Sequence, residues 1–261
     1  MWDFEHGRPT PDFDIAYTVP SRCAADLAAG TADIGIIPAA AYTTIPDLMV
    51  LPKVAIASRR AVRSILLVST VPVSQVRSVA LDSSSLTSVA LTRVLFSQYW
   101  KTQPAFFSMA PQIDSMLAQC DAALVIGDPA LQLDSSKYFA YDLAEEWIRW
   151  TARPFVFAFW AVRKAALEAV DPALDLPAVF QQSRDHGLQP ENLEQIARDW
   201  GPRMGLTADD VRSYLTENIF YSLDADCLEG LQLFYRLAHS CAALPAASPL
   251  QFLEAANSLL R

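Results

Sequence analysis

The chain has 261 residues, 52% of them hydrophobic, and a formal net charge of −9. That length allows one large domain or two smaller ones with a sizeable core. The acidic balance, without a Lys- or Arg-rich stripe, argues against nucleic acid as a partner. No apolar run reaches the roughly 18 residues of a membrane helix, and no secretory signal opens the chain, so we expect a cytoplasmic protein with no membrane contact. The four cysteines form no CxxC pair, which favours reduced thiols.

The first half of the chain alternates strand-like and helix-like segments. The expected strands cover residues 14–19, 33–38, 62–68, 78–81 and 122–126. The expected helices cover residues 22–29, with Ser21 as N-cap and Gly30 as C-terminal stop, and 112–118. A third helix follows Ser85, with an apolar face at 3.6-residue spacing made of Leu86, Ala90, Leu91, Val94 and Leu95. This alternation predicts a mostly parallel sheet that is covered on both faces.

The second half is mainly helical. One apolar strand is expected at residues 154–162, followed by helices at 174–184, 189–200, 207–219 and 226–240. Thr207, with the acidic residues after it, suits a helix start. The chain is expected to cross between lobes near residues 58–62 and 157–161. We therefore predict a two-lobed α/β fold with a ligand cleft between a lobe of residues 1–61 plus 158–261 and a lobe of residues 62–157.

A serine-rich segment, Asp82-Ser83-Ser84-Ser85-Leu86-Thr87-Ser88, stands between an expected strand and an expected helix. A helix start leaves backbone N–H groups unpaired and carries a partial positive charge, so it attracts a carboxylate or phosphate. Hydroxyls of Ser84, Thr87 and Ser88 would add donors. The alternative is that Ser84 or Ser85 merely caps the helix.

Three other positions are candidates for the cleft. Asp128 follows an apolar strand, at the sheet edge where open α/β sheets bind ligands, although an Asp that only caps the next turn is the more common case. Pro38 ends another strand and would supply apolar wall or backbone contacts. Ser64 lies near the first expected lobe crossing. Pro38 and Ser64 are equally compatible with an ordinary surface position.

Several motifs are missing from the sequence. It has no Gly-rich phosphate loop and no GxSxG elbow, and its three histidines form no HxxH or HExxH pattern. We therefore expect neither a metal nor a cofactor. The aromatic stretch from Trp147 to Trp160 is expected to pack in the core.

Six ordered blocks together resemble the chorismate dehydratase family of the futalosine route to menaquinone, over essentially the whole chain. The blocks are Pro20-Ser21-Arg22-Cys23-Ala24, Asp33-Ile34-Gly35-Ile36-Ile37-Pro38, Val62-Arg63-Ser64-Ile65-Leu66-Leu67, the serine-rich segment, Ile126-Gly127-Asp128-Pro129-Ala130-Leu131, and Asp142-Leu143-Ala144-Glu145-Glu146-Trp147 leading to Thr151, Pro154-Phe155-Val156 and Trp160.

The resemblance implies a type II periplasmic-binding-protein fold and a cofactor-independent lyase that converts chorismate to 3-[(1-carboxyvinyl)oxy]benzoate and water. It implies that Ser64 acts in catalysis. It implies that the substrate is bound by Pro38, Ser84, Leu86, Thr87, Ser88 and Asp128. The alternatives are a non-catalytic solute-binding or sensory domain of the same fold, and the sister 1,4-dihydroxy-6-naphthoate synthase, for whose catalytic histidine no aligned candidate is present.

The sequence departs from the family pattern in two places. Family members begin with a strand and a Ser-Tyr-Leu-Asn-Thr-like motif, whose Asn lies in the site, and Met1-Trp2-Asp3 matches the region just downstream. The family's first strand is therefore expected to be missing from this sequence, either because the start codon was assigned late or because the protein lacks the strand. We expect this 261-residue form to dehydrate chorismate poorly or not at all. Ala41 stands where many members carry an acidic residue.

Overall fold

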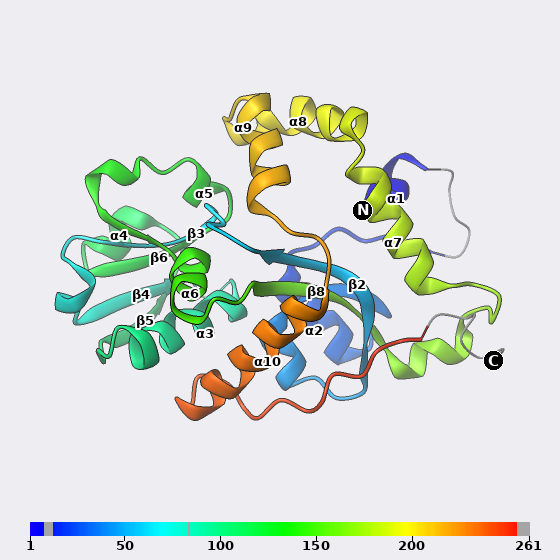
Figure 1. The fold of residues 1–261 in the computed structure, drawn as a ribbon, viewed down its shortest axis with the longest axis horizontal. Coiled ribbons are helices and arrows are strands. Elements are labelled where there is room, and N and C mark those ends of the chain that lie inside the picture. Colours follow the sequence, from blue (N-terminus) through cyan, green and yellow to red (C-terminus); the bar gives the residue numbers. More distant parts are fainter. Residues whose placement is uncertain (8–12, 83, 255–261) are drawn as a thin grey trace.

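The computed structural model describes residues 1–7, 13–82 and 84–254, and it contains two β-sheets (Figure 1). The three-stranded sheet has the order β1 (Ile34–Pro38), β8 (Phe155–Arg163) and β2 (Leu48–Ser58). The five-stranded sheet has the order β5 (Ala105–Met109), β4 (Ser78–Asp82), β6 (Ala122–Ile126), β3 (Ile65–Ser69) and β7 (Phe139–Asp142).

The strand directions correct the expectation of a mostly parallel sheet. In the five-stranded sheet, β4 runs parallel to β5 and β6, but β3 runs antiparallel to both β6 and β7. The three-stranded sheet is antiparallel throughout. In the three-stranded sheet, β8 follows α6 and enters between β1 and β2 in the direction opposite to both.

Helices surround the two sheets. The α-helices are α1 (Trp2–His6), α2 (Pro20–Ala29), α3 (Leu86–Val94), α4 (Ile113–Leu117), α5 (Asp128–Leu131), α6 (Leu143–Thr151), α7 (Leu176–Gly187), α8 (Pro190–Met204), α9 (Ala208–Ser213) and α10 (Ala225–Ser240). The 3₁₀ segments are η1 (Ala39–Thr43), η2 (Val73–Gln75), η4 (Ser135–Lys137) and η5 (Lys164–Ala169), and the π-helical turns are η3 (Leu95–Tyr99) and η6 (Tyr214–Asn218). None of the helices in the described residues has the length and apolar character needed to cross a bilayer.

The helix boundaries confirm most of the expected ones. Gly30 ends α2 in the left-handed conformation (φ 74°), but the helix begins at Pro20 rather than after Ser21, because a proline suits the first helical position. Thr207 caps α9 in a reciprocal arrangement with Asp210. In α3 the expected apolar face is buried except for Leu86, which is 44% exposed.

The strand expected at residues 14–19 is not formed. The chain there is extended but unpaired, and Ile15, Tyr17 and Val19 are 42%, 74% and 60% exposed. A strand requires hydrogen-bonding partners along its length, and none of the strands within the described ranges lies beside this segment. Its alternating apolar side chains therefore remain at the surface.

The aromatic stretch packs in the core as expected. Trp147, Phe155 and Phe234 are each fully buried and meet edge to face, with ring centroids 5.0 to 6.2 Å apart. Such pairs are favoured over face-to-face stacking by the aromatic quadrupole. Phe234 belongs to α10, so this cluster fastens the C-terminal helix to β8.

Helix α10 also holds both segments that connect the two sheets. Arg59, just after β2, pairs with Asp224 and Asp226 at the start of α10. Arg153, just before β8, pairs with Glu229 at 2.8 Å. We propose that each sheet forms the core of one lobe. Strand β8 belongs to the three-stranded sheet from Phe155 onward, so the expected division between residues 157 and 158 falls within a strand.

Alkaline pH is expected to destabilise this fold. Burial raises the pKa of the Tyr235 phenol, whose hydroxyl donates to the Ala39 carbonyl at 2.7 Å; burial acts in the same direction on the pKa of Tyr214. The unfolded chain ionises its phenols near pH 10, whereas the folded protein keeps these protons to higher pH. The contribution of the buried phenols to the free energy of unfolding is therefore complete below about pH 10 and is lost as pH rises through the folded pKa.

Each such phenol adds a slope of up to about 1.4 kcal/mol per pH unit to the free energy of unfolding. Urea titrations at successive alkaline pH values measure this slope, and the variant Tyr235→Phe should show a shallower one. A free energy of unfolding that stays constant across this range would contradict the assignment.

Candidate functional site

Four strand ends of the five-stranded sheet meet at one edge. Strands β4 and β6 are parallel, so Asp82 at the end of β4 and Asp128 just beyond β6 come to the same edge. Strand β3 starts there, and the Gly127 N–H donates to the Ser64 carbonyl at 2.8 Å. Strand β7 ends there at Asp142. Ser64, Ser84 and Asp128, which are far apart in sequence, therefore lie along one edge.

Helix α3 starts at this edge without a side-chain cap. Ser85 is the N-cap residue by its extended backbone, but its hydroxyl donates to the Ser88 hydroxyl at 2.9 Å instead of accepting from the helix. Ser84 turns back, with its N–H donating to Asp82 at 2.9 Å. Ser85 therefore occupies the expected N-cap position, but no side-chain hydrogen bond caps the helix. The first-turn N–H groups keep their attraction for an anion.

Thr87 links this helix to the three-stranded sheet. Its hydroxyl accepts the N–H of Ala40, in η1, at 3.1 Å, and the side chain is 1% exposed. Ser88 is also fully buried, whereas Leu86 lies at the surface. A hydroxyl that accepts one hydrogen bond still has its own proton to donate. Thr87 thus joins α3 to η1, the segment that follows β1, and retains a donor.

Pro38 is buried at the end of β1, and η1 follows directly after it. The wall that follows it is apolar and consists of small residues, with Ala39, Ala40 and Ala41 all buried. The hydroxyl of Tyr235 reaches this wall from α10. Pro38 and its neighbours are therefore buried apolar residues close to Thr87, and the contact of Pro38 with a ligand stays a prediction.

Ser64 is the predicted residue with the most informative contact. It is 6% exposed, and its hydroxyl accepts a hydrogen bond from the Tyr214 hydroxyl at 2.9 Å. Tyr214 lies 150 residues further along the chain in η6, so no local pattern in the sequence could have indicated it. Burial, with Asp128 nearby, raises the pKa of the Tyr214 phenol despite the hydrogen bond.

Asp142 is a second residue that the sequence did not single out as functional. Its carboxylate accepts the N–H groups of Val62 and Arg63 at 3.1 and 2.6 Å, just before Ser64, and also those of Ala144 and Glu145 at 3.0 and 3.1 Å. Burial raises the pKa of this carboxyl, against the four N–H donors that favour its ionised form. Asp142 thereby holds the strained residue Arg63 (φ 63°), and with it the start of β3.

Four of the predicted site residues, Pro38, Ser64, Thr87 and Ser88, are buried, whereas Ser84, Leu86 and Asp128 are exposed. A hollow of about 400 Å³ lies between the end of α7, α8 and η6, and its lining includes Leu193, Leu215 and Tyr221 but none of the predicted residues. Among the described residues, no three His, Cys, Asp or Glu side chains are grouped as a metal would require.

The sequence pattern of the family described as menaquinone biosynthesis matches residues 1–240. The chain belongs to this family. The chain is similar in sequence to the chorismate dehydratase of Thermus thermophilus, with 25% identity over 240 residues that cover 85% of each chain.

Solved structures with the same fold include binding proteins. A protein of Archaeoglobus fulgidus superimposes with a TM-score of 0.65 at 13% identity, over 88% of this chain and 86% of that one. The periplasmic aliphatic sulphonate binding protein of Escherichia coli gives 0.59 at 17% identity, over 91% and 82%. The alkanesulfonate-binding protein of Xanthomonas axonopodis gives 0.59 at 16%, over 87% and 81%. This member of the menaquinone-biosynthesis family therefore has a periplasmic-binding-protein-like fold, as expected.

Proposed function

We propose that the chain is a chorismate dehydratase that forms 3-[(1-carboxyvinyl)oxy]benzoate and water in the cytoplasm without a cofactor. The observation that carries the proposal is the meeting of an uncapped helix start and Ser64 at one sheet edge. Membership of the menaquinone-biosynthesis family and the similarity to the Thermus thermophilus enzyme support the same reaction.

The chemistry requires few protein groups. Chorismate carries two carboxylates, and breaking its C4–O and C3–H bonds makes the ring aromatic, which provides a large driving force. The start of α3 would bind one carboxylate through its N–H groups and the Thr87 hydroxyl. The substrate's own enolpyruvyl carboxylate would accept the C3 proton, and the C4 hydroxyl takes up one proton and leaves as water, so the step balances. The Ser64 hydroxyl would donate a hydrogen bond to the departing hydroxyl.

The remaining predicted residues have secondary roles. Ser84 and Ser88 would complete the carboxylate site, Pro38 and Leu86 would contact the ring, and Asp128 would border the site at the end of β6. The substrate would enter when the two lobes move apart, because Ser64, Thr87 and Ser88 are buried in the present state.

Loss of chorismate absorbance with the appearance of an aromatic product tests the reaction directly. Protein in excess over chorismate allows a slow single turnover to be seen, and chromatography identifies the product. A solute-binding domain would bind chorismate without changing it. Unchanged chorismate after prolonged incubation with folded protein would reject the proposed reaction.

Thr87→Val is expected to weaken chorismate binding by about 1–3 kcal/mol, because a donor to a charged carboxylate is lost. Calorimetric titration measures the change. The matched control, Thr87→Ser, keeps the hydroxyl and should bind like the parent. Since valine also leaves the Ala40 N–H without its partner, melting is measured in parallel. Unchanged affinity in folded Thr87→Val would show that Thr87 does not bind the carboxylate.

A further inference from the structure

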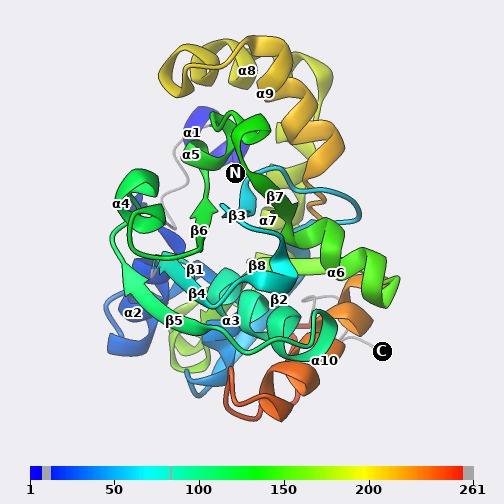
Figure 2. The same cartoon turned by 90° about the vertical axis from the view of Figure 1, so that its left-hand side faces the viewer.

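A helical arm made of α8, α9 and η6 extends over the site edge. Figures 1 and 2 show α8 and α9 together at the top of the molecule, with η6 descending from α9. Its contacts with the five-stranded part of the molecule are hydrogen bonds from Gln132 to the Met204 carbonyl, from Asn218 to the Ala61 carbonyl at 2.8 Å, and from Tyr214 to Ser64. Tyr214 and Asn218 thus both contact the segment that leads into β3.

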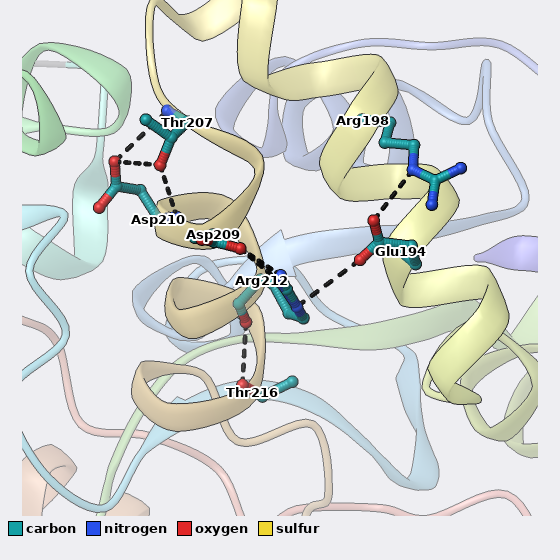
Figure 3. A network of polar contacts seen from close by, with 7 residues as sticks. All are labelled: Glu194, Arg198, Thr207, Asp209, Asp210, Arg212 and Thr216. Carbon is teal, nitrogen blue, oxygen red and sulfur yellow. Dashed lines mark hydrogen bonds and ion pairs between the residues drawn. The ribbon is translucent and has the colours of Figure 1, made fainter.

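The arm is internally braced (Figure 3). Arg212 of α9 pairs with Asp209 and, at 3.7 Å, with Glu194 of α8, which also binds Arg198 at 2.9 Å. Exposed ion pairs contribute little one at a time, but a shared network restricts the relative movement of the helices that it joins. Tyr214 lies two residues after Arg212, at the start of η6, so this network braces the part of the arm that carries Tyr214.

The Tyr214 contact determines which way the Ser64 proton points. A phenol with its proton in place donates to the serine oxygen, so the serine proton must be directed elsewhere. The Ser64 carbonyl is occupied by the Gly127 N–H, and within the described residues the Ser64 hydroxyl donates to no other group. Its proton is therefore free for a ligand at the sheet edge.

We propose that Tyr214 is a positioning residue that holds the Ser64 hydroxyl as a hydrogen-bond donor toward the departing hydroxyl of the substrate. This inference rests on the proposed dehydratase function. It gives the helical arm a part in the reaction, although the arm contributes no other residue to the proposed site.

The test compares Tyr214→Phe with the parent under single-turnover conditions with chorismate. The expected result is a loss of about 10–100-fold in the rate constant at saturation, as for a misplaced reacting group, with the half-saturating concentration changed by less than about threefold. The matched control is Tyr221→Phe, another phenol at the end of the arm whose hydroxyl bonds to none of the described residues, and it should keep the parent rate. In a Ser64→Ala background, Tyr214→Phe should cause no further loss.

Incorporating 3-fluorotyrosine at position 214 provides a second variant that keeps the size and fold of the parent. Fluorine lowers the phenol pKa, and a phenolate cannot donate to Ser64, so the alkaline limb of the rate profile should move to lower pH. An unmoved limb, or a parent-like rate in Tyr214→Phe, would overturn the positioning role while leaving the dehydratase proposal standing. Failure of the parent protein to convert chorismate would overturn the proposed function and this role together.

Discussion

Ser64→Ala is expected to slow chorismate dehydration by about 10²–10³-fold, the usual cost of removing one preorganised donor aimed at developing charge. The serine is 6% exposed and its hydroxyl has a defined direction, so alanine removes a donor that solvent does not replace. Binding of chorismate should change little, because the helix start remains. Single-turnover rates and calorimetric titrations separate the two effects.

The chain offers a matched control for this variant. Ser69 is a fully buried serine at the other end of β3, where its hydroxyl donates to the Asp121 carbonyl at 2.9 Å. Ser69→Ala should cost about 1 kcal/mol of stability without slowing the reaction. Equal rate losses in the two variants would mean that Ser64 acts through the fold alone, and a parent-like rate in Ser64→Ala would remove it from the catalytic step.

Gly230→Ala is expected to destabilise the protein by about 2–3 kcal/mol, although alanine is the better helix former. Gly230 lies in α10 directly against the Pro154 carbonyl, and an added methyl group would collide with this backbone oxygen. Helix propensity alone predicts the opposite sign, a gain of about 1 kcal/mol. The free energy of unfolding from urea titration therefore distinguishes the two effects by sign.

The neighbouring position supplies the control. Glu229→Ala removes the exposed pair with Arg153 and should change stability by less than about 1 kcal/mol, because pairs at the surface are screened by solvent. If Gly230→Ala proved as stable as the parent or more stable, α10 would not be pressed against the segment before β8 as the structure has it.

Elements with a strong local pattern were predictable from the sequence. Strands β1, β4 and β6 are short buried apolar runs, and Thr207 carries a complete capping signal for α9. Three strands were not predicted. Most of β5 is exposed, β7 has only four residues, and β2 is interrupted by a bulge around Lys53 (φ 64°). Periodicity cannot identify a strand whose side chains are not sorted between core and solvent.

The site was predictable only in part for a related reason. Asp128 and the start of α3 could be placed together because parallel strands bring their carboxyl ends to one edge. Asp142 and Tyr214 approach Ser64 through antiparallel pairing and a distant helical arm, with sequence separations of about 80 and 150 residues. Contacts of this range leave no periodic trace in a single sequence.

The position of α10 has a mechanical consequence for the two connecting segments. The same helix pairs with Arg59 after β2 and with Arg153 before β8, and packs Gly230 on the backbone between α6 and β8. If the two lobes rotated, a change of backbone torsion in one segment would displace α10 and with it the other segment. We therefore expect the two connections to move together, because both are held by the last helix described in the chain.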